Sequence, residues 1–497
     1  MSIYILLSSS LFLSVTSSDN NYNHYNIFAM STSTSNAPDP YLGRWSGTST
    51  TKPFNDFTII DIVYRDGHSY LHRHDRRSPK PLEGQISYTS NNVFMATVPT
   101  WLGGAATIYG TFHSNSFGVV LIAKIEGDGL TGLETIEVHL KQGAPEHEKY
   151  LAPRLDVAPE SHPNNADFMS TAAPEALNMT AEQLDAAIQA IIRPRSHPDN
   201  RVEGLLILKD GHRVHESYYY GLTASDSHPC ASITKSIVSL LTGIAIDEGF
   251  LSLDDPVAAA FDIPSAWTDS PPILLRHALS MTPGTAFSQR DTAKMLTSTS
   301  VASLILNAPR RYGDPGAKYH YDNSLPTIVS LLIERKSGLG IEAFARKYLF
   351  GPLGITNYTW TRMHEDSVDG TPFVLPSGGL NMTLTDLAKV GELLLGGGAY
   401  RGNRIVSADY IEAATKSQTR EGDYPYGYFF HSNEGGRHVP GDGSVGAYMA
   451  LGSGGQVIWV APRQKLVFVA VGSSWMSFEE TPVVLRSFAD TVLRGLE

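Results

Sequence analysis

The sequence has 497 residues, of which 42% are hydrophobic and 18% charged. This ordinary globular composition excludes a mainly disordered, collagenous or coiled-coil chain. The net charge of −12 argues against nucleic acid as the main partner, because an acidic surface repels phosphates. The single cysteine, Cys230, excludes an intrachain disulfide and any multi-cysteine metal site. At roughly 150 residues per domain, the length predicts two or three domains.

The N-terminal residues have some features of a targeting segment. Residues 3–15 are apolar and serine-rich and have the size of a signal-peptide core, but no Lys or Arg precedes them. This stretch is too short and too rich in serine to span a bilayer, and no later stretch is longer and more apolar, so we expect no integral membrane span. We interpret residues 1–40 as a signal-like or disordered leader. The localisation stays open between a secreted or periplasmic protein and a cytoplasmic one.

The region from residue 41 to residue 151 has the pattern of a small β domain. Its strand-like runs are separated by Gly, Ser and Asn, and they lie at 57–64, 92–98, 106–112, 117–123 and 135–140. Their short spacing predicts a barrel or a sandwich. Residues 152–174 follow with four prolines and no periodicity, which predicts a linker.

The region from residue 175 to residue 497 has strand signals at both ends and helical patterns between them. Thr180 and Gln183 have the spacing of a capping box at the start of a helix. Asp210-Gly211 separates two strand-like runs and predicts a hairpin. A second hairpin is predicted from runs at 457–460 and 466–471, and a final helical pattern covers 483–493. This order predicts one antiparallel sheet that is covered by helices and interrupted by a helical insertion.

The most informative motif is Ser232-Ile-Thr-Lys235. The apolar residues that follow recur at helical spacing, so a buried helix begins here with Ser232 and Lys235 on one face. A serine hydroxyl is a weak nucleophile that needs a base within hydrogen-bond reach, and a buried lysine can serve. The alternative interpretation is a helix-capping serine with a solvated lysine.

Two further motifs have functional and structural interpretations of their own. Tyr321-Asp-Asn323 precedes an apolar helix and can present a phenol and an amide to a cleft, although a core tyrosine and a helix cap fit equally. Ser453-Gly454-Gly455-Gln456 opens a strand, where glycines let a substrate approach the backbone as in an oxyanion hole. The alternative for this segment is a tight turn.

The order of these three motifs resembles the serine β-lactamase and penicillin-binding-protein superfamily. Within it the chain is similar to the class C-like serine hydrolases, which include esterases, D-amino-acid-releasing peptidases and 6-aminohexanoate-dimer hydrolases. Further matching segments lie at 204–211, 275–284, 350–354 and 377–388. The resemblance covers about residues 175–497. It implies an α+β fold in which a β-lactamase-like antiparallel sheet is flanked by helices with a helical subdomain, preceded here by the small β-rich domain.

The resemblance also implies roles for the motif residues. Ser232 would be the nucleophile, Lys235 its general base, and Tyr321 the group that protonates the leaving group. Asn323 would bind Lys235 or the substrate amide. The strand with Ser453, Gly454, Gly455 and Gln456 would border the oxyanion hole, formed by the N–H groups of Ser232 and Gln456. A small ester or amide would then be hydrolysed through an acyl-serine, which requires no cofactor or metal. The oligomeric state stays open.

The third motif departs from the superfamily pattern. Lactamases and peptidases of the superfamily usually have Lys-Thr-Gly or His-Thr-Gly where this chain has Ser453-Gly454-Gly455. The missing cation removes a partner for a substrate carboxylate, which favours an esterase or amidase over a β-lactamase or D-Ala peptidase. A cation from elsewhere in the chain would restore the interpretation as a β-lactamase or D-Ala peptidase. The candidates for this cation are Arg276, Arg437 and His438. A third interpretation is a non-catalytic scaffold or binding protein.

Overall fold

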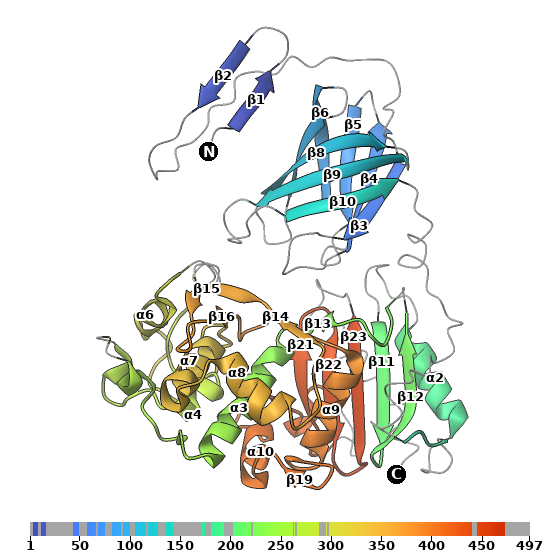
Figure 1. Ribbon diagram of the computed structural model, residues 1–497. Coiled ribbons are helices and arrows are strands. Elements are labelled where there is room, and N and C mark those ends of the chain that lie inside the picture. The colour runs from blue at the N-terminus through green and yellow to red at the C-terminus, as the bar shows by residue number, and fades with distance from the viewer. Residues whose placement is uncertain are drawn as a thin grey trace. The chain divides into compact units, whose positions relative to one another are not determined.

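The computed structural model divides the chain into two compact units, Met1–Glu148 and Lys149–Glu497 (Figure 1). In the first unit the structure describes residues 3–7, 11–15, 43–48, 57–65, 68–74, 82–90, 93–99, 105–115, 118–127 and 136–142. In the second unit it describes residues 170–173, 180–192, 202–219, 222–261, 263, 266–287, 295, 298–439 and 445–472. Most of the expected linker and the helical pattern at 483–493 therefore lie outside the described residues.

The first unit contains a closed antiparallel barrel of eight strands (Figure 1). Successive strands pair with each other, and β10 closes the barrel by pairing with β3. The strands are β3 (Gly43–Thr48), β4 (Phe57–Arg65), β5 (His68–His74), β6 (Leu82–Ser90), β7 (Val93–Pro99), β8 (Ala105–Asn115), β9 (Gly118–Gly127) and β10 (Ile136–Gln142). Separately, β1 (Ile3–Leu7) pairs with β2 (Leu11–Val15). Closure leaves the barrel without the unpaired edges that an open sheet would expose.

Side chains of the barrel alternate between its interior and its surface, as the two-residue period of a strand requires. Ile86, Phe94 and Ile108 are buried, whereas Ser87 and Tyr109, which follow Ile86 and Ile108, are exposed. A β-carbon on Gly110 would lie only 2.2 Å from the Phe94 ring. Glycine at this position therefore makes room for the Phe94 ring inside the barrel.

The second unit is built on a six-stranded antiparallel sheet in the order β12-β11-β23-β22-β21-β20. Its strands are β11 (Val202–Lys209), β12 (His212–Tyr218), β20 (His431–Ser432), β21 (Tyr448–Gly452), β22 (Gln456–Ala461) and β23 (Leu466–Gly472). Both predicted hairpins are confirmed, because β11 pairs with β12 and β22 pairs with β23. β11 also pairs with β23, so strands far apart in the sequence meet in the middle of the sheet.

Helices cover both faces of this sheet. Leu205 and Ile207 of β11 belong to an apolar cluster with α2 (Ala181–Ile192), whereas Leu206 and Leu208 belong to a larger cluster with α3 (Ile233–Asp247) and α9 (Leu384–Leu395). Burial on both faces explains why β11 is almost continuously apolar. The predicted capping box of α2 is confirmed by paired hydrogen bonds between Thr180 and Gln183, at 3.1 and 3.4 Å.

The remaining elements form a mainly helical insertion and short sheets beside the large sheet (Figure 1). The helices are η3 (Val257–Ala260), η4 (Ala266–Thr268), α4 (Leu275–Leu279), α6 (Val301–Leu306), α7 (Leu325–Ser337), α8 (Ile341–Ala345), η5 (Arg346–Phe350), α10 (Ala408–Thr415) and η6 (Glu434–Gly436). The short strands are β13 (His228–Pro229), β14 (Tyr358–Trp360), β15 (Arg362–Asp366), β16 (Pro372–Val374), β17 (Leu380–Met382), β18 (Ala399–Tyr400) and β19 (Asn403–Arg404).

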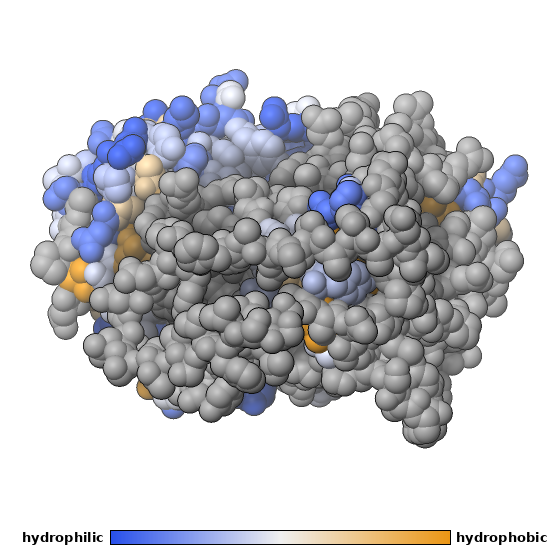
Figure 2. Space-filling model, turned by 90° about the horizontal axis from the view of Figure 1, so that it is seen from above, coloured by the Kyte–Doolittle hydropathy of each residue, from blue (hydrophilic) through white to orange (hydrophobic). Residues whose placement is uncertain are grey.

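On the face drawn in Figure 2, the described residues that can be seen are mainly hydrophilic, with smaller hydrophobic areas between them. The exposed large hydrophobic side chains in these segments are Tyr88, Tyr109, Val368 and Val445. Among the same residues, no helix combines the length and the apolar character needed to cross a membrane.

Candidate active site

Ser232 stands at the N-terminus of α3, immediately before the first helical residue, Ile233. Ala231 before it has a φ of +46°, a left-handed conformation that is uncommon for residues other than glycine. The turn is held in place because Cys230 N–H donates to the Leu380 carbonyl at 2.8 Å. The Thr234 hydroxyl also donates to the Ala231 carbonyl at 2.7 Å. Ser232 is half-buried, whereas the helix residues directly after it are buried.

Lys235 lies one helical turn beyond Ser232, as the sequence predicted. Its Nζ atom is hydrogen-bonded to Ser232 Oγ at 2.8 Å, and the side chain is only 1% exposed. Nζ also donates to the backbone carbonyl of Ser377, which is 142 residues away in the sequence. This second bond holds the lysine beside the serine rather than in solvent.

Tyr321 contributes the third predicted side chain. The centre of its ring lies 5.1 Å from Lys235 Nζ, and the residue is half-buried. Asn323 is also half-buried, and its side-chain amide has no hydrogen bond to another described residue. The expected contact between Asn323 and Lys235 is therefore not formed here, and the amide is available to a substrate.

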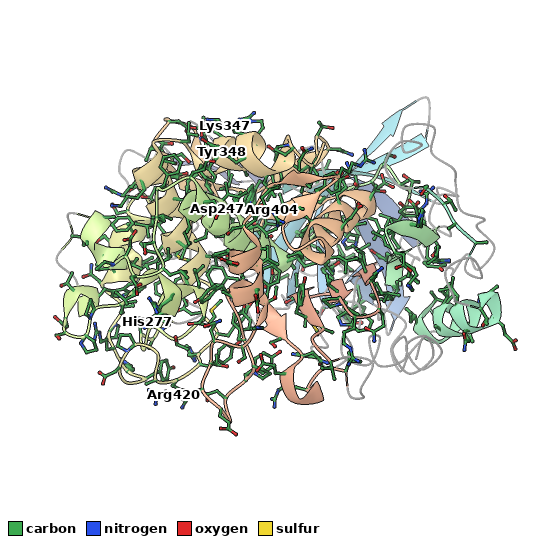
Figure 3. The ribbon with its side chains drawn as sticks, turned by 90° about the horizontal axis from the view of Figure 1, so that it is seen from below. Asp247, His277, Lys347, Tyr348, Arg404 and Arg420 are labelled. Atoms are coloured by element: carbon green, nitrogen blue, oxygen red, sulfur yellow. The ribbon has the colours of Figure 1, made fainter. Side chains whose placement is uncertain are left out.

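Several backbone hydrogen bonds position the loop that carries Tyr321. His320 N–H donates to the Met281 carbonyl and Gly316 N–H to the Thr282 carbonyl, both at 2.8 Å. Arg420, labelled in Figure 3, donates to the Gly316 carbonyl at 3.1 Å. The loop is thus tied both to the end of α4 and to the segment that precedes β20.

Asp322, between Tyr321 and Asn323, is a buried carboxyl group at the candidate site, and the sequence analysis gave it no role. The residue is 2% exposed, and its Oδ1 atom accepts hydrogen bonds from the Ser324 N–H and hydroxyl at 2.7 and 2.6 Å. Its Oδ2 atom is buried without a partner among the described residues. Burial raises the pKa of this carboxyl to about 6, although the bonds from Ser324 and the charge of Lys235 oppose that shift.

The glycine-rich strand end lies against the turn before Ser232. A β-carbon on Gly452 would lie 2.4 Å from the Cys230 carbonyl oxygen and 3.1 Å from Ala231 Cβ, so only glycine permits this approach. Gly454 and Gly455 both have positive φ angles, and Ser453 is half-buried. Among the described residues, no backbone hydrogen bond uses the Ser232 N–H, which leaves this group available to an oxyanion.

Gln456 has a structural function in addition to its predicted place beside the oxyanion hole. Its side chain is fully buried, donates to the Gly472 carbonyl at 2.7 Å and accepts from the Gly472 N–H at 3.2 Å. A further bond from its amide nitrogen reaches the Ser453 carbonyl at 3.2 Å. The side chain therefore fixes the strand ends, and only the backbone of Gln456 can face a substrate.

A buried pair that includes His228, four residues before the proposed nucleophile, also escaped the sequence analysis. His228 Nε2 lies 2.8 Å from Glu203 Oε2, and both residues are less than 5% exposed. Glu203 belongs to β11 and His228 to β13. The pair therefore anchors the strand that leads into Ser232 to the large sheet. No local pattern could have revealed it, since the partners are 25 residues apart.

A second group, of which the sequence analysis named only His438, surrounds Tyr424. The Tyr424 hydroxyl is hydrogen-bonded to His431 Nδ1 at 2.8 Å and to His438 Nε2 at 2.9 Å. Burial, together with the charges of His438 and Lys235, holds the pKa of His431 well below its usual range. The imidazole of His431 is therefore neutral at pH 7.

The β-lactamase family model matches residues 188–483, more than half of the chain. The chain belongs to the β-lactamase family. It is 26% identical over 301 residues to a 6-aminohexanoate-dimer hydrolase of Paenarthrobacter ureafaciens, an alignment that covers 55% of this chain and 72% of that relative. The predicted class, a β-lactamase-related serine hydrolase that cleaves esters or amides, is thereby confirmed.

Solved structures of this family share the fold of the chain. A putative β-lactamase from Bacteroides dorei has a TM-score of 0.51 at 18% identity, covering 63% of this chain and 99% of its own. A putative 6-aminohexanoate-dimer hydrolase from Bacillus anthracis has a TM-score of 0.50 at 17% identity, covering 69% and 90%. The predicted antiparallel sheet flanked by helices is confirmed by this likeness. The roles of the individual site residues stay predictions.

Proposed function

We propose that this β-lactamase family member hydrolyses small esters or amides through an acyl intermediate on Ser232. The observation that carries the proposal is the 2.8 Å hydrogen bond between Ser232 Oγ and the buried Lys235 Nζ. A hydrogen-bonded nucleophile and base, with the base held by a further group, is the arrangement that nucleophilic catalysis requires. The Ser377 carbonyl is that further group.

Acylation follows from the positions of these groups. Ser232 Oγ attacks the substrate carbonyl while Lys235 Nζ, which must be unprotonated for this step, accepts the hydroxyl proton. The negative oxygen of the tetrahedral intermediate then accepts hydrogen bonds from the Ser232 N–H and from a backbone N–H at the glycine-rich strand end. Tyr321 gives its proton to the leaving alcohol or amine, and Lys235 returns a proton to Tyr321. The carbon–leaving group bond breaks, which leaves the acyl group on Ser232.

Deacylation reverses these proton transfers. A water oxygen attacks the acyl-Ser232 carbonyl and loses a proton to the Lys235–Tyr321 pair. The bond between the carbonyl carbon and Ser232 Oγ breaks, and the serine recovers its proton. Asn323, whose amide has no hydrogen bond to another described residue, would bind the substrate beside this reaction.

The third strand motif and one relative guide the choice of substrate class. Ser453-Gly454-Gly455 offers no side-chain cation to a β-lactam carboxylate. The relative from Paenarthrobacter ureafaciens is named for the hydrolysis of a 6-aminohexanoate dimer. Both points favour open-chain esters or amides over β-lactams and D-Ala peptides.

The test is intact mass spectrometry after brief exposure to p-nitrophenyl esters of several chain lengths. We expect one acyl adduct on the wild-type protein and none on Ser232→Ala. Ser225→Ala, which removes an exposed serine hydroxyl from the same unit, serves as the matched control and should retain the adduct. Folded wild-type protein that forms no adduct and releases no p-nitrophenol with any ester would contradict the proposal.

A further inference from the structure

Met281, two residues after the end of α4, has an unusual backbone conformation. Its φ angle is +59°, in the left-handed region that a bulky side chain rarely adopts. The residue is fully buried, and its N–H donates to the Ala278 carbonyl at 3.2 Å. Strained residues of this kind persist only where the surrounding structure holds them, and they tend to lie at functional sites.

The buried residues that share this conformation all lie close to the candidate site. The described residues other than glycine with a positive φ are Asp210, Ala231, Met281, Arg401, Phe429 and Lys465. Asp210, Arg401 and Lys465 lie in turns and are not buried. Of the three buried ones, Ala231 precedes the proposed nucleophile. The Phe429 carbonyl accepts from Ser236 Oγ at 2.6 Å, next to Lys235. Met281 remains, and its contacts lead to Tyr321.

Met281 is hydrogen-bonded to both neighbours of Tyr321. Its carbonyl oxygen accepts from the His320 N–H at 2.8 Å. Its sulfur atom, Sδ, accepts from the Asp322 N–H, with 3.3 Å between sulfur and nitrogen. Tyr321 lies between these two residues, so a single methionine holds the backbone on both sides of the proposed proton donor.

The sulfur atom is needed because the Asp322 N–H has no other acceptor. Among the described residues, no backbone carbonyl accepts from this group, and a buried N–H without a partner is costly. A thioether is a weak acceptor, but its long, flexible side chain reaches a donor that the neighbouring backbone does not. Leucine would fill a similar volume without accepting a hydrogen bond.

The segment after Met281 is packed closely on the chain that leads to Tyr321. A β-carbon on Gly284 would lie 2.1 Å from the Gly313 carbonyl oxygen, and the Gly316 N–H donates to the Thr282 carbonyl at 2.8 Å. These contacts hold the beginning of the loop. Met281 holds the end that carries the phenol.

We propose that Met281 is a positioning residue for Tyr321, which it keeps where the phenol can protonate the leaving group. The inference rests on the proposed function and adds to it a residue that acts through Tyr321. A proton donor works only within hydrogen-bond reach of the acceptor, and a displacement of about 1 Å can lower a rate by about 100-fold. Loss of the sulfur should therefore affect substrates according to their need for that proton.

The experiment compares ethyl butanoate with p-nitrophenyl butanoate, two esters of one acid. Ethoxide is strongly basic and needs a proton to leave, whereas p-nitrophenolate leaves without one. We expect Met281→Leu to lower kcat/KM for the ethyl ester by about 10- to 100-fold. Its effect on the p-nitrophenyl ester should stay within about 3-fold, because this ester depends little on the phenol.

A double-mutant cycle separates positioning from a general effect on the fold. In Tyr321→Phe protein the phenol is absent, so adding Met281→Leu should lower kcat/KM for the ethyl ester by no more than about 2-fold. Met281→Gln supplies an amide oxygen in place of the sulfur and should retain more activity on the ethyl ester than Met281→Leu. Met363→Leu makes the same exchange at another buried methionine of this apolar cluster and should leave the ratio of the two esters unchanged.

Three outcomes are decisive. Equal losses on both esters in Met281→Leu, or losses that multiply in the double variant, would overturn this inference and leave Ser232 as the nucleophile. Rapid amide hydrogen exchange at both His320 and Asp322 in folded wild-type protein would also overturn it, since both N–H groups should be protected. Failure of p-nitrophenyl butanoate to acylate wild-type Ser232 would overturn the proposed function as well.

Discussion

A β-carbon on Gly452 would lie 2.4 Å from the carbonyl oxygen of Cys230, two residues before the proposed nucleophile. An alanine at this position must therefore displace either the end of β21 or the turn that carries Ser232. We expect Gly452→Ala to lower kcat/KM for p-nitrophenyl esters by about 100-fold, the cost of losing one oxyanion donor, with a loss of stability of about 1–3 kcal/mol. Ester hydrolysis and thermal unfolding measure the two effects.

Gly378 provides the matched control for that substitution. A β-carbon on Gly378 would lie 3.7 Å from the backbone of Ala231, an ordinary van der Waals contact. Gly378→Ala should therefore retain activity within a few-fold of wild type. If Gly452→Ala were as active as Gly378→Ala, the close packing of the strand end would have no part in catalysis.

Replacing Lys235 should remove the base without removing the nucleophile. We expect Lys235→Met to lower kcat/KM by about 10²–10⁴-fold, the usual contribution of a positioned base. Methionine matches the length and apolar stem of lysine, so the buried helix should stay folded, which circular dichroism can check. Rapid acylation of Ser232 in folded Lys235→Met protein would show that another group is the base.

The effect of Tyr321→Phe should depend on the leaving group. A phenol that protonates the departing atom matters most when that atom is strongly basic, and p-nitrophenolate leaves without help. We expect a loss of about 10²–10⁴-fold for anilides or alkyl esters and a clearly smaller loss for p-nitrophenyl esters of the same acid. Equal losses for all leaving groups would assign Tyr321 to another step.

Asp322 should make stability depend on pH. Burial raises the pKa of this carboxyl from 3.8 to about 6, so the folded protein binds the proton more tightly than the unfolded chain does. The stabilisation that follows from this proton is fully present below about pH 4. That contribution is lost as the pH rises through 6. A shift of this size corresponds to about 2–3 kcal/mol. Denaturant unfolding at pH 4 and pH 7 should show Asp322→Asn gaining stability relative to wild type at the higher pH. Parallel pH profiles would contradict this expectation.

Local sequence patterns predicted the elements that bear the site. The Thr180–Gln183 capping box, the turn at Asp210-Gly211 and the helix after Ser232 all depend on residues close in sequence. For this reason the spacing of Ser232 and Lys235 translates directly into their 2.8 Å contact. The resemblance to a family then placed Tyr321 and the glycine-rich strand in the same site.

The partners that hold these residues could not be predicted in the same way. The Ser377 carbonyl meets Lys235 across 142 residues, and a backbone carbonyl leaves no signature in the residue types. Tyr424, His431 and His438 look like ordinary loop and edge-strand residues until the fold brings both histidines to the Tyr424 hydroxyl. The side chain of Gln456 bonds to Gly472, a contact that depends on the register of β22 and β23. Such contacts depend on the tertiary fold rather than on local sequence.

The long sequence separation of the groups around Ser232 has a consequence during synthesis. Ser232 leaves the ribosome well before Tyr321, Ser377 and Gly452. The six-stranded sheet of the second unit is completed only when β23 (Leu466–Gly472) pairs with β11. In a shorter nascent chain, Lys235 is therefore not yet held by the Ser377 carbonyl, and the oxyanion hole beside Ser232 has not yet formed. Esterase activity should appear only after β23 has left the ribosome, so it reports that all six strands of the sheet have been made.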